Sequence, residues 1–176
     1  MCAVSKIKKR FIFIALIFCL FTPRIGFASS CGLETKRIEG LSLAPLIKNG
    51  TTIEVRPTAC ILSLKINDIA IFHSGARKEP IAKIVKALPG DHFRIQDSKI
   101  YTNDQILKNS EGFEYTLPAS STKLLEAYAR SYNGTIPNDT YLLIGDNPSG
   151  SLDSSRLGLI HKKDILWVGK APNPSE

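Results

Sequence analysis

The sequence lacks the usual features of a metal or redox centre. It has no Cys-x-x-Cys pair, and its three histidines, His73, His92 and His161, are far apart along the chain. Zinc sites usually take at least two of their ligands from residues close together in the sequence. We therefore expect no bound metal, and no motif in the chain implies a cofactor.

Long apolar runs and clusters of one charge are also scarce. The apolar run Phe11 to Phe21 has about half of the ~20 residues that a helix needs to cross a bilayer. The net charge is +7, but the basic residues beyond the N-terminus are scattered and are not interleaved with aromatic residues. Nucleic acid is therefore not an expected partner.

Residues 1–28 are typical of an export segment. Four basic residues, Lys6, Lys8, Lys9 and Arg10, precede the apolar run, and small residues stand at Gly26 and Ala28. This pattern predicts either a signal peptide cleaved after Ala28 or an uncleaved N-terminal membrane anchor. A lipid anchor at Cys31 fits less well, because Ala28 occupies the position of a bulky aliphatic residue. All three alternatives place residues 29–176 in the periplasm, either free or anchored at the inner membrane.

Cysteine usage agrees with export. Cys31 and Cys60 are the only two cysteines beyond the export segment. An even number of cysteines in an oxidising compartment makes them a disulfide candidate, with two unpaired thiols as the alternative.

Alternating apolar and polar residues dominate the exported part and predict short strands separated by turn residues. These strands are 51–56, 69–72, 81–86, 92–95, 99–101, 141–144 and 165–168. The segment Thr122 to Tyr132 predicts a helix, capped by Ser121 and ended near Gly134. We expect one mostly β domain over residues 29–171, a barrel or a more complex β fold with one short inserted helix, and a loose tail over 172–176.

Two segments carry candidate reactive side chains. Ser42 lies in a turn bounded by Gly40 and Pro45, although a lone turn serine is more often structural. Lys83 lies within the strand 81–86, on the opposite face from its neighbours. If that face is buried, desolvation lowers the pKa of the Lys83 amine, and a neutral amine can accept a proton from a serine hydroxyl. Lys86 lies on the other face and is expected to be solvated.

A third segment, residues 145–158, places several polar side chains directly after an apolar strand. The simplest interpretation is a surface loop without a role in a site. It could equally hold supporting groups, with Ser151 donating a hydrogen bond to a catalytic amine and Asp153 pairing with Arg156 to hold the loop in one shape.

The order of the three segments resembles the bacterial type I signal peptidase family, which uses a Ser/Lys dyad on a β-rich fold. The family pattern Gly-x-Ser-Met-x-Pro resembles residues 40–45, the lysine before Leu-Pro-Gly-Asp resembles Lys83 before 88–91, and the late Gly-Asp-Asn and Ser-x-Asp-Ser box resembles 145–154. The resemblance covers residues 38 to 171.

The resemblance implies a role for each matching residue. Ser42 would be the nucleophile, Lys83 the general base, and Asp146, Ser151, Asp153 and Arg156 supporting residues. Gly40, Leu43 and Pro45 would contribute to the oxyanion hole or to substrate contacts. The oxyanion hole would rest on the Ser42 backbone N–H, because Gly40 has no side-chain donor.

Some residues depart from the family pattern. Leu43 replaces the usual Met, and Pro148 and Ser149 replace a charged pair. The extra Ser155 shifts Arg156 by one position, which makes its role less secure. The compact size resembles the TraF-type peptidases of conjugative plasmids, which process a pilin precursor or another transfer protein.

The expected function is a serine endopeptidase that cleaves exported precursor proteins, either signal peptides or a conjugative pilin, at the outer face of the cytoplasmic membrane. Two alternatives stay open. A self-cleaving repressor has similar chemistry, but it would carry a DNA-binding module where this chain has an export segment. A catalytically degenerate envelope protein could serve as a binding or assembly module of a secretion or conjugation machine.

Overall fold

The computed structural model describes residues 31–147 and 150–171. Contacts divide the chain after Ser30, and all the described residues belong to the second unit. The predicted export segment 1–28 and the predicted tail 172–176 lie outside the described residues. Within the described ranges, no helix has the length and apolar character needed to span a membrane.

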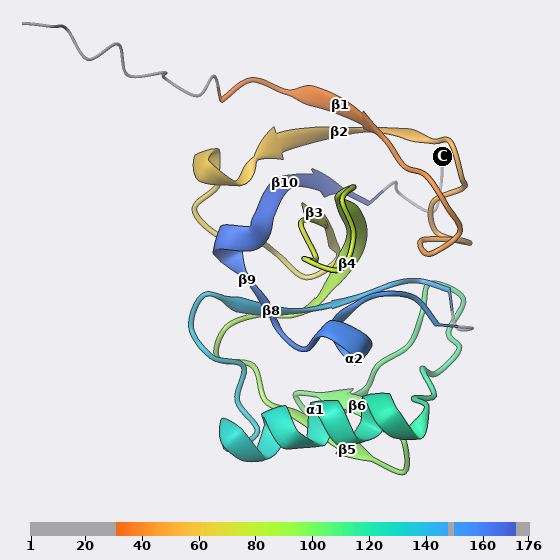
Figure 1. Cartoon of the computed structure of the whole chain (residues 1–176), viewed down its shortest axis with the longest axis vertical. Helices are drawn as coiled ribbons and strands as arrows, with labels where there is room; N and C mark the ends of the chain where they lie inside the picture. Colours follow the sequence, from red (N-terminus) through yellow and green to blue (C-terminus); the bar gives the residue numbers. More distant parts are fainter. Residues whose placement is uncertain (1–30, 148–149, 172–176) are drawn as a thin grey trace, which may run out of the picture. The chain divides into compact units, whose positions relative to one another are not determined.

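The described chain forms ten strands, two α-helices and two short 3-10 turns (Figure 1). The strands are β1 (Glu34–Arg37), β2 (Thr52–Pro57), β3 (Asp68–Phe72), β4 (Ile81–Ala87), β5 (Phe93–Gln96), β6 (Lys99–Thr102), β7 (Gln105–Ile106), β8 (Thr140–Ile144), β9 (Ile160–His161) and β10 (Ile165–Lys170). The helices are α1 (Ala119–Ser131) and α2 (Ser154–Leu157), and the 3-10 turns are η1 (Thr58–Cys60) and η2 (Lys162–Asp164).

Seven strands make one antiparallel sheet in the order β1-β2-β10-β3-β4-β8-β9. Strands β3 and β8 are buried along their whole length, which agrees with their continuous apolar sequences. Strand β4 lies between these two strands, and Ala70 of β3 stands opposite Lys83. A lysine at this register is placed in the middle of the sheet, where water has little access.

A smaller sheet of β5, β6 and β7 lies beside helix α1 (Figure 1). Gln96 pairs with Lys99 across Asp97 and Ser98, both with positive φ, so a two-residue hairpin turn joins β5 to β6. Phe93 and Leu125 belong to one buried cluster with Leu142 and Ile144 of β8. This cluster joins the small sheet and the helix to the large sheet.

The mostly β fold class with an inserted helix is confirmed. Among the described residues the strands form two open sheets, so of the two predicted alternatives the complex β fold applies. Helix α1 begins at Ala119, after Pro118, and Ser121 is buried in its first turn where a capping role was predicted.

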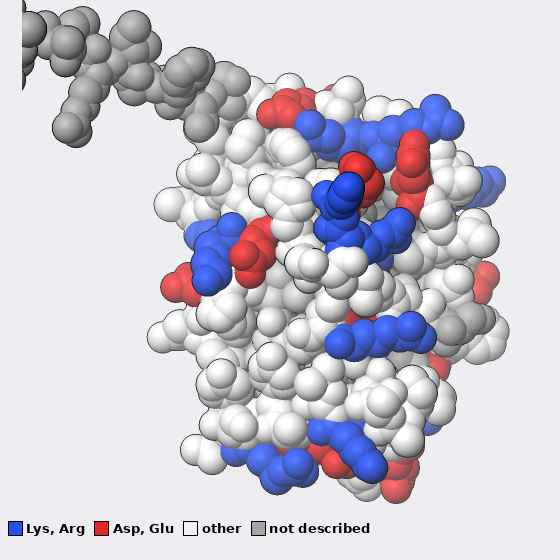
Figure 2. Space-filling view, viewed as in Figure 1, with Lys and Arg blue, Asp and Glu red and all other residues white. Residues whose placement is uncertain are grey.

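A disulfide joins Cys31 to Cys60, with 5.5 Å between their Cα atoms. Cys31 precedes β1, and Cys60 ends the short turn that follows β2. Because β1 is an edge strand that pairs only with β2 in the described sheet, the bond fixes the start of this edge to its neighbour. On the face shown in Figure 2, basic and acidic groups are interspersed.

Candidate active site

The turn that carries Ser42 is anchored in the core by the next residue, Leu43. Leu43 is fully buried among apolar residues of β2, β3 and β4. Backbone hydrogen bonds from Ala44 N to Leu41 O and from Ile47 N to Leu43 O close the turn at 3.1 and 2.8 Å. Gly40 enters the turn with φ +87, a conformation that side chains disfavour. The result is a Ser42 side chain that is only half-buried on a fixed backbone.

Lys83 reaches Ser42 from strand β4. Lys83 is 3% exposed, and its Nζ atom lies 2.8 Å from Ser42 Oγ. Nζ also donates to the backbone carbonyl of Ala82 at 2.7 Å. A hydroxyl and an amine at this distance can exchange a proton without further movement.

The environment of Lys83 favours its neutral form. Burial lowers the pKa of the Lys83 amine from 10.5 to about 8, because a charged amine loses hydration inside the protein. The negative charge of Asp153 partly opposes this effect, and the positive charge of Arg77 adds to it. A large fraction of Lys83 is therefore neutral and able to accept a proton at mildly alkaline pH.

The Ser42 backbone provides a free donor beside the hydroxyl. Among the described residues, none accepts a hydrogen bond from the Ser42 N–H. Its carbonyl oxygen, in contrast, accepts from Asp146 N at 2.8 Å and from Asn147 N at 3.3 Å. An unengaged backbone N–H next to a nucleophile is the type of group that stabilises an oxyanion.

Asp153 organises the late loop through several donors. Its carboxylate accepts from Gly145 N at 3.0 Å, from Ser155 N at 2.9 Å and from the Ser151 hydroxyl. The bond to Ser155 caps helix α2. Ser151 thus donates to Asp153 in this structure, and the expected direct hydrogen bond to the Lys83 amine is not seen among the described residues.

The expected pairing of Asp153 with Arg156 is not formed among the described residues. Arg156 is exposed, and within residues 31–147 and 150–171 no ion pair joins it to the Asp153 carboxylate. The buried carboxylate is instead satisfied by neutral donors. Arg156 and Asp153 both line a cleft of about 420 Å³ beside Tyr115.

Asp146 is fully buried and lies on the other side of the nucleophile turn. Its carboxylate accepts hydrogen bonds from Leu46 N at 3.1 Å and from the backbone and side chain of Ser110 at 2.9 and 2.5 Å. Together with the bond from its own N–H to Ser42 O, these contacts tie the nucleophile turn to the loop after β8.

A cleft of about 640 Å³ opens over Ser42 and Lys83. Its walls include the apolar side chains Leu41, Ile71, Ile81, Leu152 and Trp167, together with the charged Arg77 and Glu79. Leu41 is 65% exposed, so this residue presents the apolar surface next to the nucleophile.

The residues predicted to contact substrate separate into two groups. Gly40 lines the cleft, as does Ser151. Leu43 and Pro45 do not line it: Leu43 is buried in the core, and Pro45 is exposed elsewhere on the turn. Leu43 is fully buried and presents no side-chain surface to a ligand, so its expected substrate role has no support in the structure.

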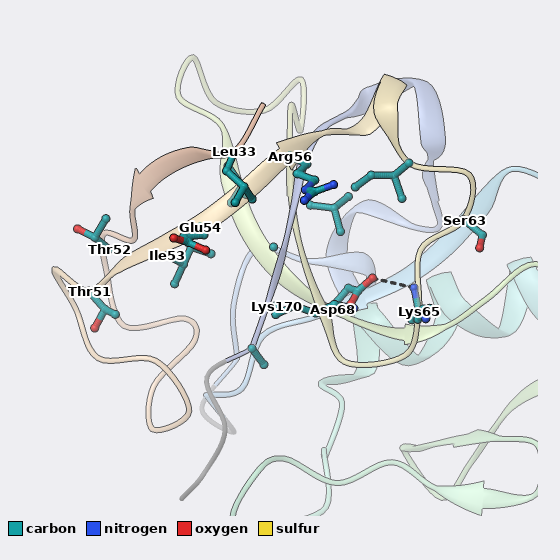
Figure 3. A pocket seen from close by; sticks show the side chains of 15 residues that line it. Leu33, Thr51, Thr52, Ile53, Glu54, Arg56, Ser63, Lys65, Asp68 and Lys170 are labelled. Atoms are coloured by element: carbon teal, nitrogen blue, oxygen red, sulfur yellow. Dashed lines mark hydrogen bonds and ion pairs between the residues drawn. The ribbon is translucent and has the colours of Figure 1, made fainter. Parts of the chain in front are cut away.

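A second cleft, of about 780 Å³, lies along β2 and β10 (Figure 3). Neither Ser42 nor Lys83 lines it. Its polar side chains include Asp68, whose carboxylate pairs with Lys170 and accepts from Lys65 N at 2.8 Å. These groups already satisfy one another. Ser42 and Lys83 line the cleft of about 640 Å³ and not this one.

Lys86 is not the solvated side chain that the sequence predicts. It is half-buried, its Nζ donates to Lys108 O at 3.3 Å, and burial lowers its pKa. It nevertheless points away from Ser42, because successive side chains on β4 alternate between faces and Lys83 occupies the other one.

Sequence reasoning did not find Ser110, Asn109 or Arg77. Ser110 reaches Asp146 across 36 positions of sequence, and Arg77 reaches the cleft from the loop between β3 and β4. Neither contact leaves a local pattern in the chain.

The chain is similar to known proteins of one family. The profile of a family described as "Signal peptidase, peptidase S26" matches residues 7–174. Signal peptidase I of Streptococcus pneumoniae is 27% identical over 93% of this chain and 91% of its own length. Signal peptidase I of Bacillus licheniformis is 29% identical over 78% and 74%.

A crystal structure of a signal peptidase I from Enterococcus faecalis is also similar, with 22% identity, a TM-score of 0.41, and coverage of 60% of this chain and 95% of that one. The family profile spans nearly the whole sequence, and the protein is therefore a serine endopeptidase that belongs to the signal peptidase family, peptidase S26.

Proposed function

We propose that Ser42 is the nucleophile and Lys83 the general base of this endopeptidase. The observation that carries the proposal is the 2.8 Å separation of Ser42 Oγ and Lys83 Nζ, with the amine buried. A catalytically degenerate module would have no need to bury an amine against a serine, because this burial costs stability.

The reaction proceeds in two halves. Ser42 Oγ attacks the scissile carbonyl carbon while its proton passes to Lys83 Nζ, and the Ser42 N–H donates to the developing oxyanion. The tetrahedral intermediate then collapses, the C–N bond breaks, and the departing amine takes the proton from Lys83. A water molecule attacks the resulting ester in the same way, with Lys83 accepting its proton, and releases the new carboxylate and the Ser42 hydroxyl.

The proposed substrate is an exported precursor protein, cut at a site with small residues at the outer face of the cytoplasmic membrane. Relatives named signal peptidase I support signal peptides as the general substrate class. A conjugative pilin or another transfer protein is the narrower candidate, suggested by the small size of the domain. The apolar walls of the cleft suit an extended apolar segment.

Co-expression tests this proposal. The full chain is produced in cells with a secreted precursor whose signal peptide ends in Ala-x-Ala, and the mature product is identified by intact mass. We expect cleavage after the last alanine with the native chain and none with Ser42→Ala. Equal processing by Ser42→Ala, or no processing by the native chain of any precursor tried, pilin precursors included, would contradict it.

A further inference from the structure

A tight turn at residues 108–113 approaches the active site from the small sheet. Asn109 holds this turn from within: its Oδ1 atom accepts from Glu111 N at 3.0 Å and from Phe113 N at 2.9 Å. Its backbone N–H also donates to Phe113 O at 2.9 Å. Asn109 is buried, and its side-chain oxygen accepts two hydrogen bonds, so the turn holds Ser110 in one orientation.

Ser110 supplies most of the hydrogen bonds that satisfy Asp146. Among the described residues three donors reach this carboxylate: two belong to Ser110, and the third is Leu46 N. No lysine or arginine of the described chain lies within ion-pair distance of Asp146. A fully buried carboxylate without a salt bridge depends strongly on such neutral donors.

Asp146 in turn makes hydrogen bonds to two residues of the turn that carries Ser42. The Asp146 N–H donates to Ser42 O at 2.8 Å, and the Asp146 carboxylate accepts from Leu46 N at 3.1 Å. The turn at 108–113 is also fixed to the same residue by Asn109 Nδ2, which donates to Asp146 O at 3.3 Å. A displacement of Asp146 would therefore move Ser42 relative to Lys83.

We propose that Ser110 is a positioning residue that holds the Ser42 hydroxyl against the Lys83 amine by fixing Asp146. This inference rests on the proposed Ser42 and Lys83 roles and deepens them. Ser110 does not line the cleft over the dyad, so it does not contact substrate.

The expected signature is a loss in turnover with little change in substrate binding. A displacement of about 1 Å between reacting groups can cost about a hundredfold in rate. Ser110→Ala removes one of the two Ser110 donors and leaves the backbone donor, so we expect kcat to fall about tenfold and KM to change less than about twofold. Ser110→Thr keeps the hydroxyl and should restore kcat to within about threefold of the native value.

A matched variant separates positioning from general destabilisation. Thr140 is also buried, and its hydroxyl donates to Pro137 O at 2.8 Å at the start of the same strand that leads to Asp146. Thr140→Val removes that hydroxyl bond far from the cleft. It should lower the melting temperature and leave kcat at the native value.

The experiment measures kcat, KM and melting temperature for the full chain, with a synthetic precursor peptide that carries alanine at the first and third positions before the scissile bond. Ser42→Ala is the inactive reference. Native kcat in Ser110→Ala, failure of Ser110→Thr to restore activity, or an equal kcat loss in Thr140→Val would overturn the positioning role. Native activity in Ser42→Ala would instead overturn the proposed function, so the two failures are distinct.

Discussion

The carbonyl oxygen of Ser42 lies only 2.6 Å from the point where a Cβ atom on Gly145 would stand. The Ser151 hydroxyl lies 2.5 Å from the same point. These two atoms leave no room for a side chain, so glycine at this position lets the late loop approach the nucleophile turn. The close approach also allows Gly145 N to donate to Asp153.

We predict that Gly145→Ala loses about a hundredfold in kcat/KM, because the new methyl group must push the Ser42 carbonyl away from its donors. Gly134→Ala is the matched control: its Cβ would stand 3.3 Å from Phe93 O, far from the cleft, at φ +69. This control should be destabilised and retain its rate constants. Native kcat/KM in Gly145→Ala would show that the close approach is not required.

The rate should depend on pH through Lys83. Its amine must be neutral to accept the Ser42 proton, and its pKa lies at about 8. We therefore expect kcat/KM to fall about tenfold for each pH unit below 8 and to level off above it. A profile that is flat between pH 6 and 9 would contradict this.

Arg77 should shift the same profile. Its positive charge lowers the pKa of Lys83, and it lines the cleft. Arg77→Gln removes this charge, so the pKa of Lys83 should rise and the acid limb of the profile should move to higher pH. An unchanged or lowered midpoint in the kcat/KM profile would rule out the electrostatic role of Arg77.

The buried amine should also cost stability. Lowering the pKa of Lys83 from 10.5 to about 8 corresponds to a penalty on the order of 3 kcal/mol at neutral pH. The unfolded chain binds the extra proton between pH 8 and 10.5, so the free energy of unfolding rises with pH across this window. The penalty is full below pH 8 and absent above 10.5.

We predict that Lys83→Met, which keeps a long unbranched side chain, is more stable than the native chain at pH 7 by up to about 3 kcal/mol. The difference should shrink at pH 10.5. Denaturant unfolding at the two pH values measures it, and a Lys83→Met variant that is less stable at pH 7 would be inconsistent with a penalised amine.

The sequence predicted the strands that form the centre of the domain. The expected strand 81–86 corresponds to β4, and 141–144 corresponds to β8, because both are apolar and bounded by turn residues. Strands β1, β7 and β9 were missed, because they are short and form by pairing with neighbouring strands. The short helix α2 was also missed, because its N-cap, Asp153, was interpreted as a salt-bridge partner.

The site could be predicted only where a residue type fits a local pattern. Ser42 and Lys83 stand in recognisable turns and strands, and the structure brings their side chains together. Leu43 was misplaced because an apolar residue next to a nucleophile can face either the core or the cleft. Ser110 could not be found, because its contact with Asp146 depends on how two distant loops fold.

The disulfide should contribute stability without affecting catalysis. It closes a loop with a sequence separation of 29 residues, and such a loop is worth about 3.5 kcal/mol of unfolded-state entropy. Neither Cys31 nor Cys60 lines the cleft over the dyad. We expect the double variant Cys31→Ser, Cys60→Ser to lose about 3 kcal/mol in the free energy of unfolding and to keep its kcat at a temperature where it stays folded. An unchanged unfolding free energy would argue against a stabilising bond.

The most direct test of the Ser/Lys dyad is kcat/KM for Lys83→Ala beside Lys86→Ala, with the same precursor peptide. Both lysines lie on β4 and both have pKa values lowered by burial, but only Lys83 meets Ser42. We predict that Lys83→Ala loses at least about a hundredfold, as expected for a general base, while Lys86→Ala stays within about threefold of the native chain. A Lys83→Ala variant within threefold of native activity, or an equal loss in Lys86→Ala, would contradict the assignment of Lys83 as the base.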